Sequence, residues 1–595
     1  DGYGNSYFWV KPDRIVPADR VRTIRGRLAY DGSEIRPLNE DDVRAAARFF
    51  KDREILTVGV CLMHSYANPE HERRVRDILV EEYPEATVSI SSEVLREYRE
   101  YERSITTLVD AAVKPNIRNY VNNIANRLRE FSSAEGEQRD IPFYVMKSNG
   151  GVLSAEEVVH QPITTVLSGP AAGALGAALI AGVAGVDQVL TCDGGGTSTD
   201  VTVVVGGEPA LTTEGRVGVY PSKIPMIDVV TVGAGGGSIA WMTPEGTLRV
   251  GPQSAGADPG PLCYGKGGNE PTITDAHVLL GRIPPHLLGG EIPLDTELAR
   301  KGVEELAHSL GLEFEACATG ILEVSAWNQA NALRQITVKR GLDVRDFTLV
   351  TFGGSGSLLA CRLVDILGLK DVLVPLNPGN VSAFGLLTVD VRNDYVQTHV
   401  SRHDRLKIDE LQAGLDALAA EAERALEEEG FGPEQRQYAR SADLRYFGQA
   451  FEVRVPVGDG PITQELMDET AERFHRAHRE LYGYDFRNDP HQHVEWVNLR
   501  VSGIGPIKRP ELSEIAPGTG ADAALTGTRE AYFDEWVTTR VYDRARLGAG
   551  DELEGPAVIE EFSSTIPVHP GFRARIDSFG NIRLTKTSDS NGATR

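Results

Sequence analysis

Short apolar runs alternate with stretches of helical spacing in the first part of the chain. Residues 55–62 and 88–91 are short runs containing β-branched residues, and they predict buried strands. Asn39, which acidic residues follow, is a plausible N-cap of a helix, and residues 94–128 have the spacing of a long helix. This alternation of strands and helices predicts an α/β fold.

Similar patterns, interrupted by glycine turns, continue to the end of the chain. The elements predicted there are a strand pair over 189–205, a helical segment over 298–338, a strand, glycine turn and helix over 347–357, helices over 404–430 and 463–483, and short strands beyond 505. The composition also shifts along the chain. We therefore expect segments covering 1–140, 141–400, 401–505 (α/β) and 506–595 (a small β-rich domain).

Composition and charge argue against some kinds of binding partner and favour one cellular environment. A formal net charge of −25 argues against a nucleic-acid or anionic-membrane partner. The five cysteines are scattered singly, without CxxC spacing, which favours reduced thiols and a cytoplasmic protein. The printed sequence contains no run of 18 apolar residues.

The glycine turn in 189–205 is the strongest candidate for chemistry. Asp193 precedes three glycines, Gly194, Gly195 and Gly196, and Thr197 follows them. Consecutive glycines let backbone N–H groups approach a phosphate closely. Asp193 carries the only charge in this loop, so it is the best candidate to hold a metal ion or to orient the attacking oxygen. The alternative interpretation is a plain hairpin turn.

Other glycine turns have a similar setting. Residues 235–238 (Gly-Gly-Gly-Ser) lie in a glycine-rich region over 220–282, and Gly353, Gly354 and Ser355 follow an apolar strand. Ser168 and Gly169 precede a helix of small residues, where either an anion site or close helix packing would explain the pattern. The pairs His475/His478 and His491/His493 lack a matching acidic or cysteine partner, which favours ordinary histidines over metal ligands.

The loop at 193–200 resembles the second phosphate loop of the actin-like ATPase superfamily. The motifs over 220–282 and the Arg-Tyr-Phe-Gly-Gln run at 445–449 are similar to those of the hydantoinase A/5-oxoprolinase family, which also contains ATP-binding subunits of ketone carboxylases. The resemblance implies actin-like (ribonuclease-H-like) ATPase lobes: a partial N-terminal lobe over 1–140 and an ATP-binding domain over 141–400. The family's first phosphate loop is not found before residue 193, so we expect that the start of the first lobe precedes Asp1.

The resemblance also implies ATP with Mg²⁺ (or Mn²⁺) as cofactors. The residues expected to bind them are Asp193, Gly194, Gly195, Gly196, Thr197, Gly235, Gly236, Gly237, Ser238, Gly353, Gly354 and Ser355, with Asp193 as metal ligand and catalytic residue. The last three are expected to contact the adenosine. These turns are predicted at the carboxyl ends of strands, where open α/β sheets place ligands.

Two activities follow from the resemblance. The favoured one is ATP-dependent hydrolysis of a cyclic amide (hydantoin, 5-oxoproline or a lactam), in a hetero-oligomer with a hydantoinase B-type subunit. The alternative is the ATP-binding subunit of an acetone- or acetophenone-type carboxylase. A non-enzymatic nucleotide-binding scaffold is the third hypothesis. The sequence contains no HExxH, G-x-S-x-G or Cys–His signature of a conventional amidase.

Overall fold

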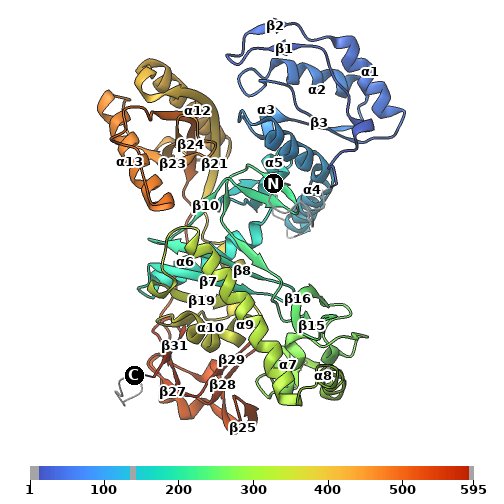
Figure 1. Cartoon of the computed structure of the whole chain (residues 1–595), viewed down its shortest axis with the longest axis vertical. Helices are drawn as coiled ribbons and strands as arrows, with labels where there is room; N and C mark the ends of the chain where they lie inside the picture. Colours follow the sequence, from blue (N-terminus) through green and yellow to red (C-terminus); the bar gives the residue numbers. More distant parts are fainter. Residues whose placement is uncertain (1–12, 135–142, 588–595) are drawn as a thin grey trace. The chain divides into compact units, whose positions relative to one another are not determined.

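The computed structural model describes residues 13–134 and 143–587. The chain divides into two compact units (Figure 1). The first unit combines Asp1–Ser168, Leu211–Met226 and Asp390–Ile507; the second combines Gly169–Ala210, Ile227–Val389 and Lys508–Arg595. Because the chain passes repeatedly between the units, they do not coincide with the contiguous segments predicted from the sequence.

The N-terminal part of the first unit is a small α/β layer. Its elements are β1 (Arg27–Leu28), β2 (Glu34–Arg36), α1 (Glu40–Lys51), β3 (Thr57–Val60), α2 (Glu70–Glu82), β4 (Thr87–Ile90), α3 (Ser91–Val94) and α4 (Glu100–Ala134). Strands β3 and β4 are parallel. The predicted N-cap is confirmed, because the Asn39 side chain accepts a 2.9 Å hydrogen bond from the Asp42 N–H.

A six-stranded sheet forms the rest of the first unit, with order β23-β22-β24-β21-β6-β5. The elements here are β5 (Tyr144–Met146), β6 (Val152–Ser154), α5 (Ala155–Val158), β11 (Gly215–Val217), β12 (Tyr220–Ser222), β21 (Val391–Arg402), α12 (Ile408–Glu428), β22 (Gln437–Tyr446), β23 (Val453–Val457), α13 (Gln464–Tyr482) and β24 (Val494–Gly505). Helices α12 and α13 pack on this sheet around Trp496, Tyr446 and Phe474.

A nine-stranded sheet is the centre of the second unit, with order β14-β8-β7-β19-β20-β31-β30-β27 and β9 beside β8. Its strands are β7 (Gln188–Gly194), β8 (Thr199–Val205), β9 (Glu208–Pro209), β14 (Val230–Val232), β19 (Thr348–Phe352), β20 (Val372–Val374), β27 (Glu552–Glu554), β30 (Phe572–Ile576) and β31 (Ile582–Lys586). Three strands of the segment expected to form a small β-rich domain over 506–595, β27, β30 and β31, thus extend this sheet.

Apolar side chains cover both faces of this sheet. On one face, Leu190 and Leu349 pack with Leu333 of α9 (Phe314–Val338) and with α10 (Ala360–Leu367). On the other face, Val189 and Val350 pack with α6 (Ser168–Val183) and α11 (Val381–Gly385). Consecutive residues of one strand thus enter different cores, as the period of two requires. Sequence patterns correctly predicted these buried strands and the helical segments between them.

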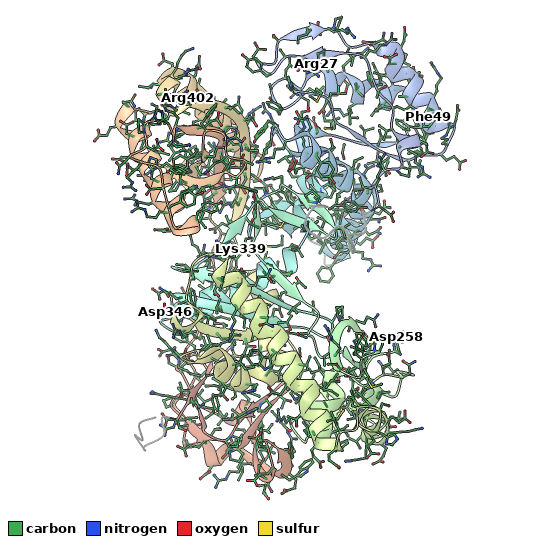
Figure 2. All side chains as sticks on the ribbon, in the orientation of Figure 1. Arg27, Phe49, Asp258, Lys339, Asp346 and Arg402 are labelled. Atoms are coloured by element: carbon green, nitrogen blue, oxygen red, sulfur yellow. The ribbon has the colours of Figure 1, made fainter. Side chains whose placement is uncertain are left out.

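Two smaller assemblies complete the second unit. One contains β15 (Ser238–Met242), β16 (Leu248–Ser254), α7 (Ile273–Leu279) and α8 (Thr296–Leu310), which pack against α9. The other is a four-stranded sheet of β25 (Leu525–Tyr532), β26 (Trp536–Asp543), β28 (Ala557–Glu561) and β29 (Ser564–Val568). At the end of α9, Lys339 (labelled in Figure 2) lies 3.8 Å from the Asp228 carboxylate. No helix in the described ranges is long and apolar enough to cross a membrane.

Candidate nucleotide site

Three glycine loops meet at one edge of the central sheet. Strands β7 and β19 are parallel, with Asp193 opposite Phe352, so the loops that follow them leave the sheet side by side. Strand β14 is antiparallel to β8 and pairs Val232 with Thr199, which brings its own following loop to the same edge. The order of the strands therefore gathers loops that are far apart in the sequence.

Backbone hydrogen bonds join the three loops. The N–H groups of Gly236 and Gly237 donate to the carbonyls of Gly195 and Gly196 at 3.1 and 2.6 Å. Ser355 donates from its N–H to the Gly194 carbonyl at 2.9 Å and from its Oγ to the Gly195 carbonyl at 2.7 Å. The loop after β7 thus has a fixed position between the other two.

Glycine is required where these backbones touch. A Cβ on Gly194 would lie 2.4 Å from the Gly356 nitrogen, and one on Gly235 would lie 2.6 Å from the Ser198 nitrogen. Both distances are shorter than real carbon contacts allow, so the loops can approach each other this closely only with glycine at these two positions. Gly196 differs, because a Cβ there would meet nothing within 4 Å.

Some backbone donors of the loops remain free. In the part of the chain that the structure describes, no acceptor receives the N–H of Gly196, Thr197 or Gly354, and all three residues are exposed. In contrast, Gly195 donates to the Ser198 carbonyl at 2.9 Å within the hairpin. The free donors point to Gly196, Thr197 and Gly354 as the groups able to bind an anion.

Asp193 is held beneath these loops. Its Oδ2 accepts a 3.2 Å hydrogen bond from the Ser382 hydroxyl, and a Cβ on Gly353 would come within 2.6 Å of its Oδ1. Burial raises the pKa of Asp193 to about 6, although the bond from Ser382 acts in the opposite direction. Within the described ranges, Asp193 forms no ion pair with a lysine or arginine, so a bound cation would be its natural partner.

Asp200 is a functional candidate that sequence reasoning did not select. It lies directly opposite Asp193 in the β7–β8 ladder, and its Oδ1 accepts a 2.5 Å hydrogen bond from the Thr231 hydroxyl. Burial also raises the pKa of Asp200. Opposed like charges destabilise a strand pair, which is a further reason to expect a cation here. The signal was present in the sequence: four loop residues separate Gly194 from Thr199, which places Asp200 opposite Asp193.

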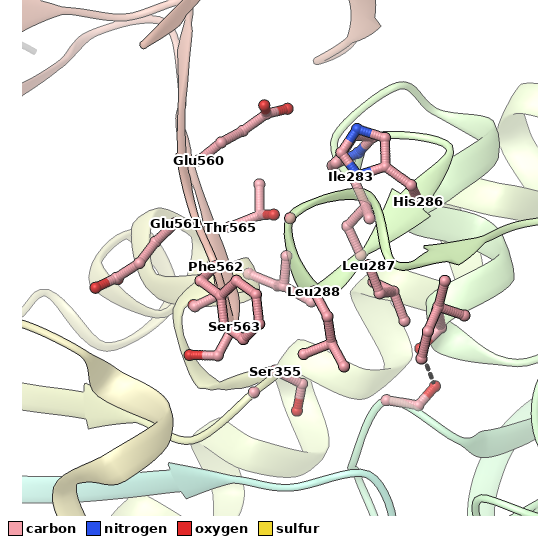
Figure 3. Close-up of a pocket in the computed structure, with 18 of the residues that line it drawn as sticks. Ile283, His286, Leu287, Leu288, Ser355, Glu560, Glu561, Phe562, Ser563 and Thr565 are labelled. Atoms are coloured by element: carbon pink, nitrogen blue, oxygen red, sulfur yellow. Dashed lines mark hydrogen bonds between the residues drawn. The ribbon is translucent and has the colours of Figure 1, made fainter. Parts of the chain in front are cut away.

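A cavity of about 780 Å³ opens beside the three loops (Figure 3). Half of the predicted residues line it: Gly195, Gly196, Gly236, Gly237, Gly354 and Ser355. The other predicted residues, Asp193, Gly194, Thr197, Gly235, Ser238 and Gly353, are not part of its lining. Of these, Ser238 begins strand β15, and Gly353 packs against the Asp193 carboxylate.

The opposite wall of the cavity is apolar and comes from distant segments. Leu287 and Leu288 belong to the segment after α7, and Phe562 lies in the turn between β28 and β29. Figure 3 shows these side chains pointing into one space, and Phe562 Cδ2 would lie 3.1 Å from a Cβ on Gly289. Nothing in the local sequence of Phe562 indicated that it belongs to this site.

Polar groups lie at the margins of the same cavity. Lys266 is an exposed cation in the lining. The buried Nδ1 of His286 has no hydrogen-bond partner among the described residues. Glu561 is already committed, because it pairs with Arg544 at 3.0 Å and accepts from the Asn377 N–H at 2.9 Å. Lys266 and His286 therefore remain available to a ligand.

The helix that begins at Ser168 favours the packing interpretation. A Cβ on Gly176 would lie 2.7 Å from the Val381 carbonyl, and one on Gly385 would lie 1.9 Å from the Ala172 carbonyl. The small residues of α6 thus allow close contact with α11.

Of the two histidine pairs, the pair on α13 forms hydrogen bonds within the protein. His475 Nδ1 lies 2.6 Å from the Tyr446 hydroxyl, and His478 Nδ1 lies 2.9 Å from the Tyr484 carbonyl. No cluster of three or more potential metal ligands (His, Cys, Asp or Glu) occurs within 13–134 and 143–587.

This fold and loop arrangement define a mixed α/β protein with a ligand cavity at a sheet edge. Models of the hydantoinase/oxoprolinase family match residues 103–395, the family's C-terminal domain matches 400–587, and its N-terminal region matches 3–83. The chain belongs to the hydantoinase/oxoprolinase family, as the resemblance predicted.

Individual relatives cover nearly the whole chain. The caprolactamase subunit alpha of Pseudomonas jessenii is 35% identical over 98% of this chain and 84% of its own length. The acetophenone carboxylase gamma subunit of Aromatoleum aromaticum is 33% identical over 96% of this chain and 79% of its own. The crystal structure of the ATP-dependent caprolactamase from Pseudomonas jessenii superposes with a TM-score of 0.86, at 34% identity, over 98% of this chain and 84% of that one.

Proposed function

We propose that this chain is the ATP-using subunit of a cyclic-amide hydrolase. The main observation behind this proposal is that three glycine loops meet beside one large cavity. These loops have free N–H donors on Gly196, Thr197 and Gly354. The free donors of Gly196 and Thr197 suit phosphate groups, whereas Gly354 lies in the loop proposed to contact the adenosine. The similarity to an ATP-dependent caprolactamase supports this choice of ligand and reaction class.

The acidic pair fits the expected metal ion. Asp193 and Asp200 oppose each other without a cationic partner among the described contacts, and carboxylates are preferred ligands of Mg²⁺ or Mn²⁺. Asp193 would hold the ion, directly or through water, and Asp200 would add negative charge beside it. The Gly194–Thr197 loop and the Gly235–Ser238 loop would fix the phosphates relative to that ion.

The two walls of the cavity suit two parts of the ligand. Gly354 and Ser355 would contact the adenosine, as the order of the loops suggests, and Gly353 would keep Asp193 in place. The apolar side chains Leu288 and Phe562 would cover a base or a hydrocarbon ring. Lys266 would balance phosphate charge. Transfer of the γ-phosphoryl group of ATP to the amide oxygen would release ADP and activate the carbonyl carbon toward water. The ring C–N bond would then break, and a second water would release phosphate from the resulting acyl phosphate.

The proposal also includes an actin-like fold for the second unit and a partner subunit. Strands β14, β8 and β7 form an antiparallel meander, and β19 and β20 continue the sheet parallel to β7. This order supports an actin-like (ribonuclease-H-like) lobe. We also propose a hetero-oligomer with a hydantoinase B-type subunit, since the relatives at 35% and 33% identity are named as subunits.

A substrate panel tests the reaction class. The chain would be purified with a hydantoinase B-type partner, and ADP release measured with hydantoin, 5-oxoproline, caprolactam, and acetone or acetophenone with bicarbonate. We expect a cyclic amide to stimulate ADP release and to be opened. Turnover that requires a ketone and bicarbonate would instead support the carboxylase alternative, which the 33% identity to the acetophenone carboxylase subunit favours.

A single substitution tests the site within the same assay. Asp193→Asn retains the shape and most hydrogen bonding but removes the charge, so turnover should fall by roughly 10²- to 10³-fold. Asp187→Asn, an exposed position just before β7, is the matched control and should retain parental turnover. Parental turnover in Asp193→Asn would refute the assignment of this loop as the phosphate site.

A further inference from the structure

A second large cavity lies within the first unit. Its volume is about 770 Å³, and it is formed by the residues around α3, the start of α5, strand β21 and the last turns of α12. We call it the Lys147 cavity. None of its lining residues belongs to the glycine-loop cavity. Its size is that of a small-molecule site.

Several buried polar atoms of this cavity lack a partner. Asn393, only 6% exposed, has no acceptor for its Nδ2 among the described residues. Ser92, 4% exposed, has no partner for its Oγ, and the same holds for the buried Nε of Arg96. Buried polar groups normally find hydrogen-bond partners. Three unpartnered atoms around one cavity therefore point to a ligand that supplies acceptor oxygens.

Lys147 adds a further donor. Its side chain is buried, and its Nζ donates a 2.9 Å hydrogen bond to the Arg392 carbonyl. An ammonium has three N–H donors, so this bond leaves others for a ligand. Asp394, in contrast, is already satisfied, because it accepts hydrogen bonds from Asn149, Arg392 and Ser502. Burial lowers the pKa of Lys147 to about 8.

Carboxylates dominate the other groups of the lining. Glu157 of α5, Glu428 of α12 and the adjoining Glu429 are among seven acidic side chains, against four basic ones, and Glu421 of α12 is already paired with Arg96 at 3.4 Å. The last turn of α12 contains no basic residue to balance the negative end of the helix. Acids at this end of a helix oppose its dipole, so the local field favours a bound cation.

Neither a plain anion nor a plain cation satisfies both features. An anion would meet the donors of Asn393 and Lys147 but would also face the excess of carboxylates. A cation would suit the carboxylates and would leave those donors unpaired. We propose that the Lys147 cavity binds a small amino acid, with its carboxylate on the donors of Asn393, Lys147 and Arg96 and its ammonium group on the carboxylates of Glu157 and α12. This site is additional to the proposed nucleotide site and does not depend on it.

Calorimetry with three related probes tests the proposal on the full chain. The probes are 6-aminohexanoate, which carries both charges, and hexanoate and hexylammonium, which carry one each. We expect 6-aminohexanoate to bind at least tenfold more tightly than either single-charge probe. Absence of binding, or equal binding of hexylammonium, would overturn the proposal, since the unpartnered buried donors would then bind only water.

Variants assign the binding to this cavity. Asn393→Leu removes an unpaired buried amide, so it should leave the melting temperature unchanged or raised while weakening 6-aminohexanoate binding about tenfold. Glu428→Gln, at an exposed position, should weaken it several-fold, and Glu427→Gln, its exposed neighbour outside the lining, should not. Unchanged binding in both Asn393→Leu and Glu428→Gln would refute the site, as would loss of binding in Ser355→Ala alone.

Discussion

Asp193 and Asp200 lie directly opposite each other across the β7–β8 ladder. Opposed residues of an antiparallel pair project from the same face, so the two carboxylates are neighbours in a partly buried environment. The pKa of each is raised, primarily by burial. Two like charges that face each other destabilise a strand pair, and a bound metal ion would offset this repulsion. The facing carboxylates therefore support the proposed metal site.

The first prediction concerns Asp200→Asn. Removing the charge that faces Asp193 should lower the pKa of Asp193 and shift the acidic limb of the ATP-turnover profile to lower pH. The Mg²⁺ concentration for half-maximal turnover should rise by about tenfold, which corresponds to about 1.4 kcal/mol of lost binding. Metal titrations at several pH values measure both effects. An unchanged Mg²⁺ dependence, equal to that of Asp187→Asn, would contradict the paired-acid model.

The second prediction is a pH-dependent gain of stability in Asp193→Asn. The folded-state pKa of about 6 exceeds the ordinary value of 3.8, so the native state binds more protons between these pH values and loses stability as the pH rises through them. Asparagine removes this loss. Without metal or nucleotide, the variant should be more stable than the parent by about 3 kcal/mol above pH 6, since one pKa unit is worth about 1.36 kcal/mol.

Unfolding transitions followed at pH 4.0 and pH 7.5 measure this difference. The two proteins should have nearly equal stability at pH 4.0 and should diverge at pH 7.5. A difference that is the same at both pH values would show that packing, rather than the charge of Asp193, separates them. Together with the expected loss of turnover, higher stability would exclude misfolding as the cause of inactivity.

Local patterns predicted much of the secondary structure. The β7–β8 hairpin, helix α9 and the cap at Asn39 all depend on residues close in sequence, and each occurs where it was expected. The division into units could not be predicted in this way. Strand β31 pairs with β20 although more than 200 residues separate them (Val372 opposite Leu584), and neither strand carries a local signal for its partner.

The candidate site, like the fold, could be predicted only where residues close in sequence determine it. Glycine turns at strand ends indicated which loops would meet, but not which donors would remain free. Gly195 uses its N–H inside the hairpin, whereas Gly196 does not, and this difference depends on turn geometry. Phe562 could not be predicted, because a single aromatic residue in a hairpin turn has no pattern that relates it to a distant loop.

The third prediction tests the contact between α6 and α11. Gly385→Ala would place a Cβ 1.9 Å from the Ala172 carbonyl, so one of the two helices must move. We expect a loss of roughly 1–3 kcal/mol, as in other overpacked interiors. Gly182→Ala in α6 is the matched control, because a Cβ there meets nothing within 4 Å and alanine favours the helix by up to about 1 kcal/mol. Equal effects of the two substitutions on the melting temperature would contradict close packing as the role of these glycines.

The fourth prediction separates the structural and ligand-binding glycines of the loop after β7. Gly194→Ala would bring a Cβ to 2.4 Å from the Gly356 nitrogen, so it should disturb two loops and lower both the melting temperature and turnover. Gly196→Ala meets no atom within 4 Å and lies at an exposed position, so its stability should remain within about 0.5 kcal/mol of the parent. Its free N–H is expected to face a phosphate, and a methyl group beside that N–H would obstruct the ligand.

Gly196→Ala should therefore raise the KM for ATP by at least several-fold at an unchanged melting temperature. Turnover measured over a range of ATP concentrations, with thermal unfolding on the same samples, gives both quantities. The opposite result, a stable Gly196→Ala protein with parental KM, would mean that the exposed N–H does not meet the nucleotide. The loop would then be a hairpin turn whose glycines serve only the contacts with Gly235 and Gly356, and the phosphates would have to bind elsewhere in the cavity.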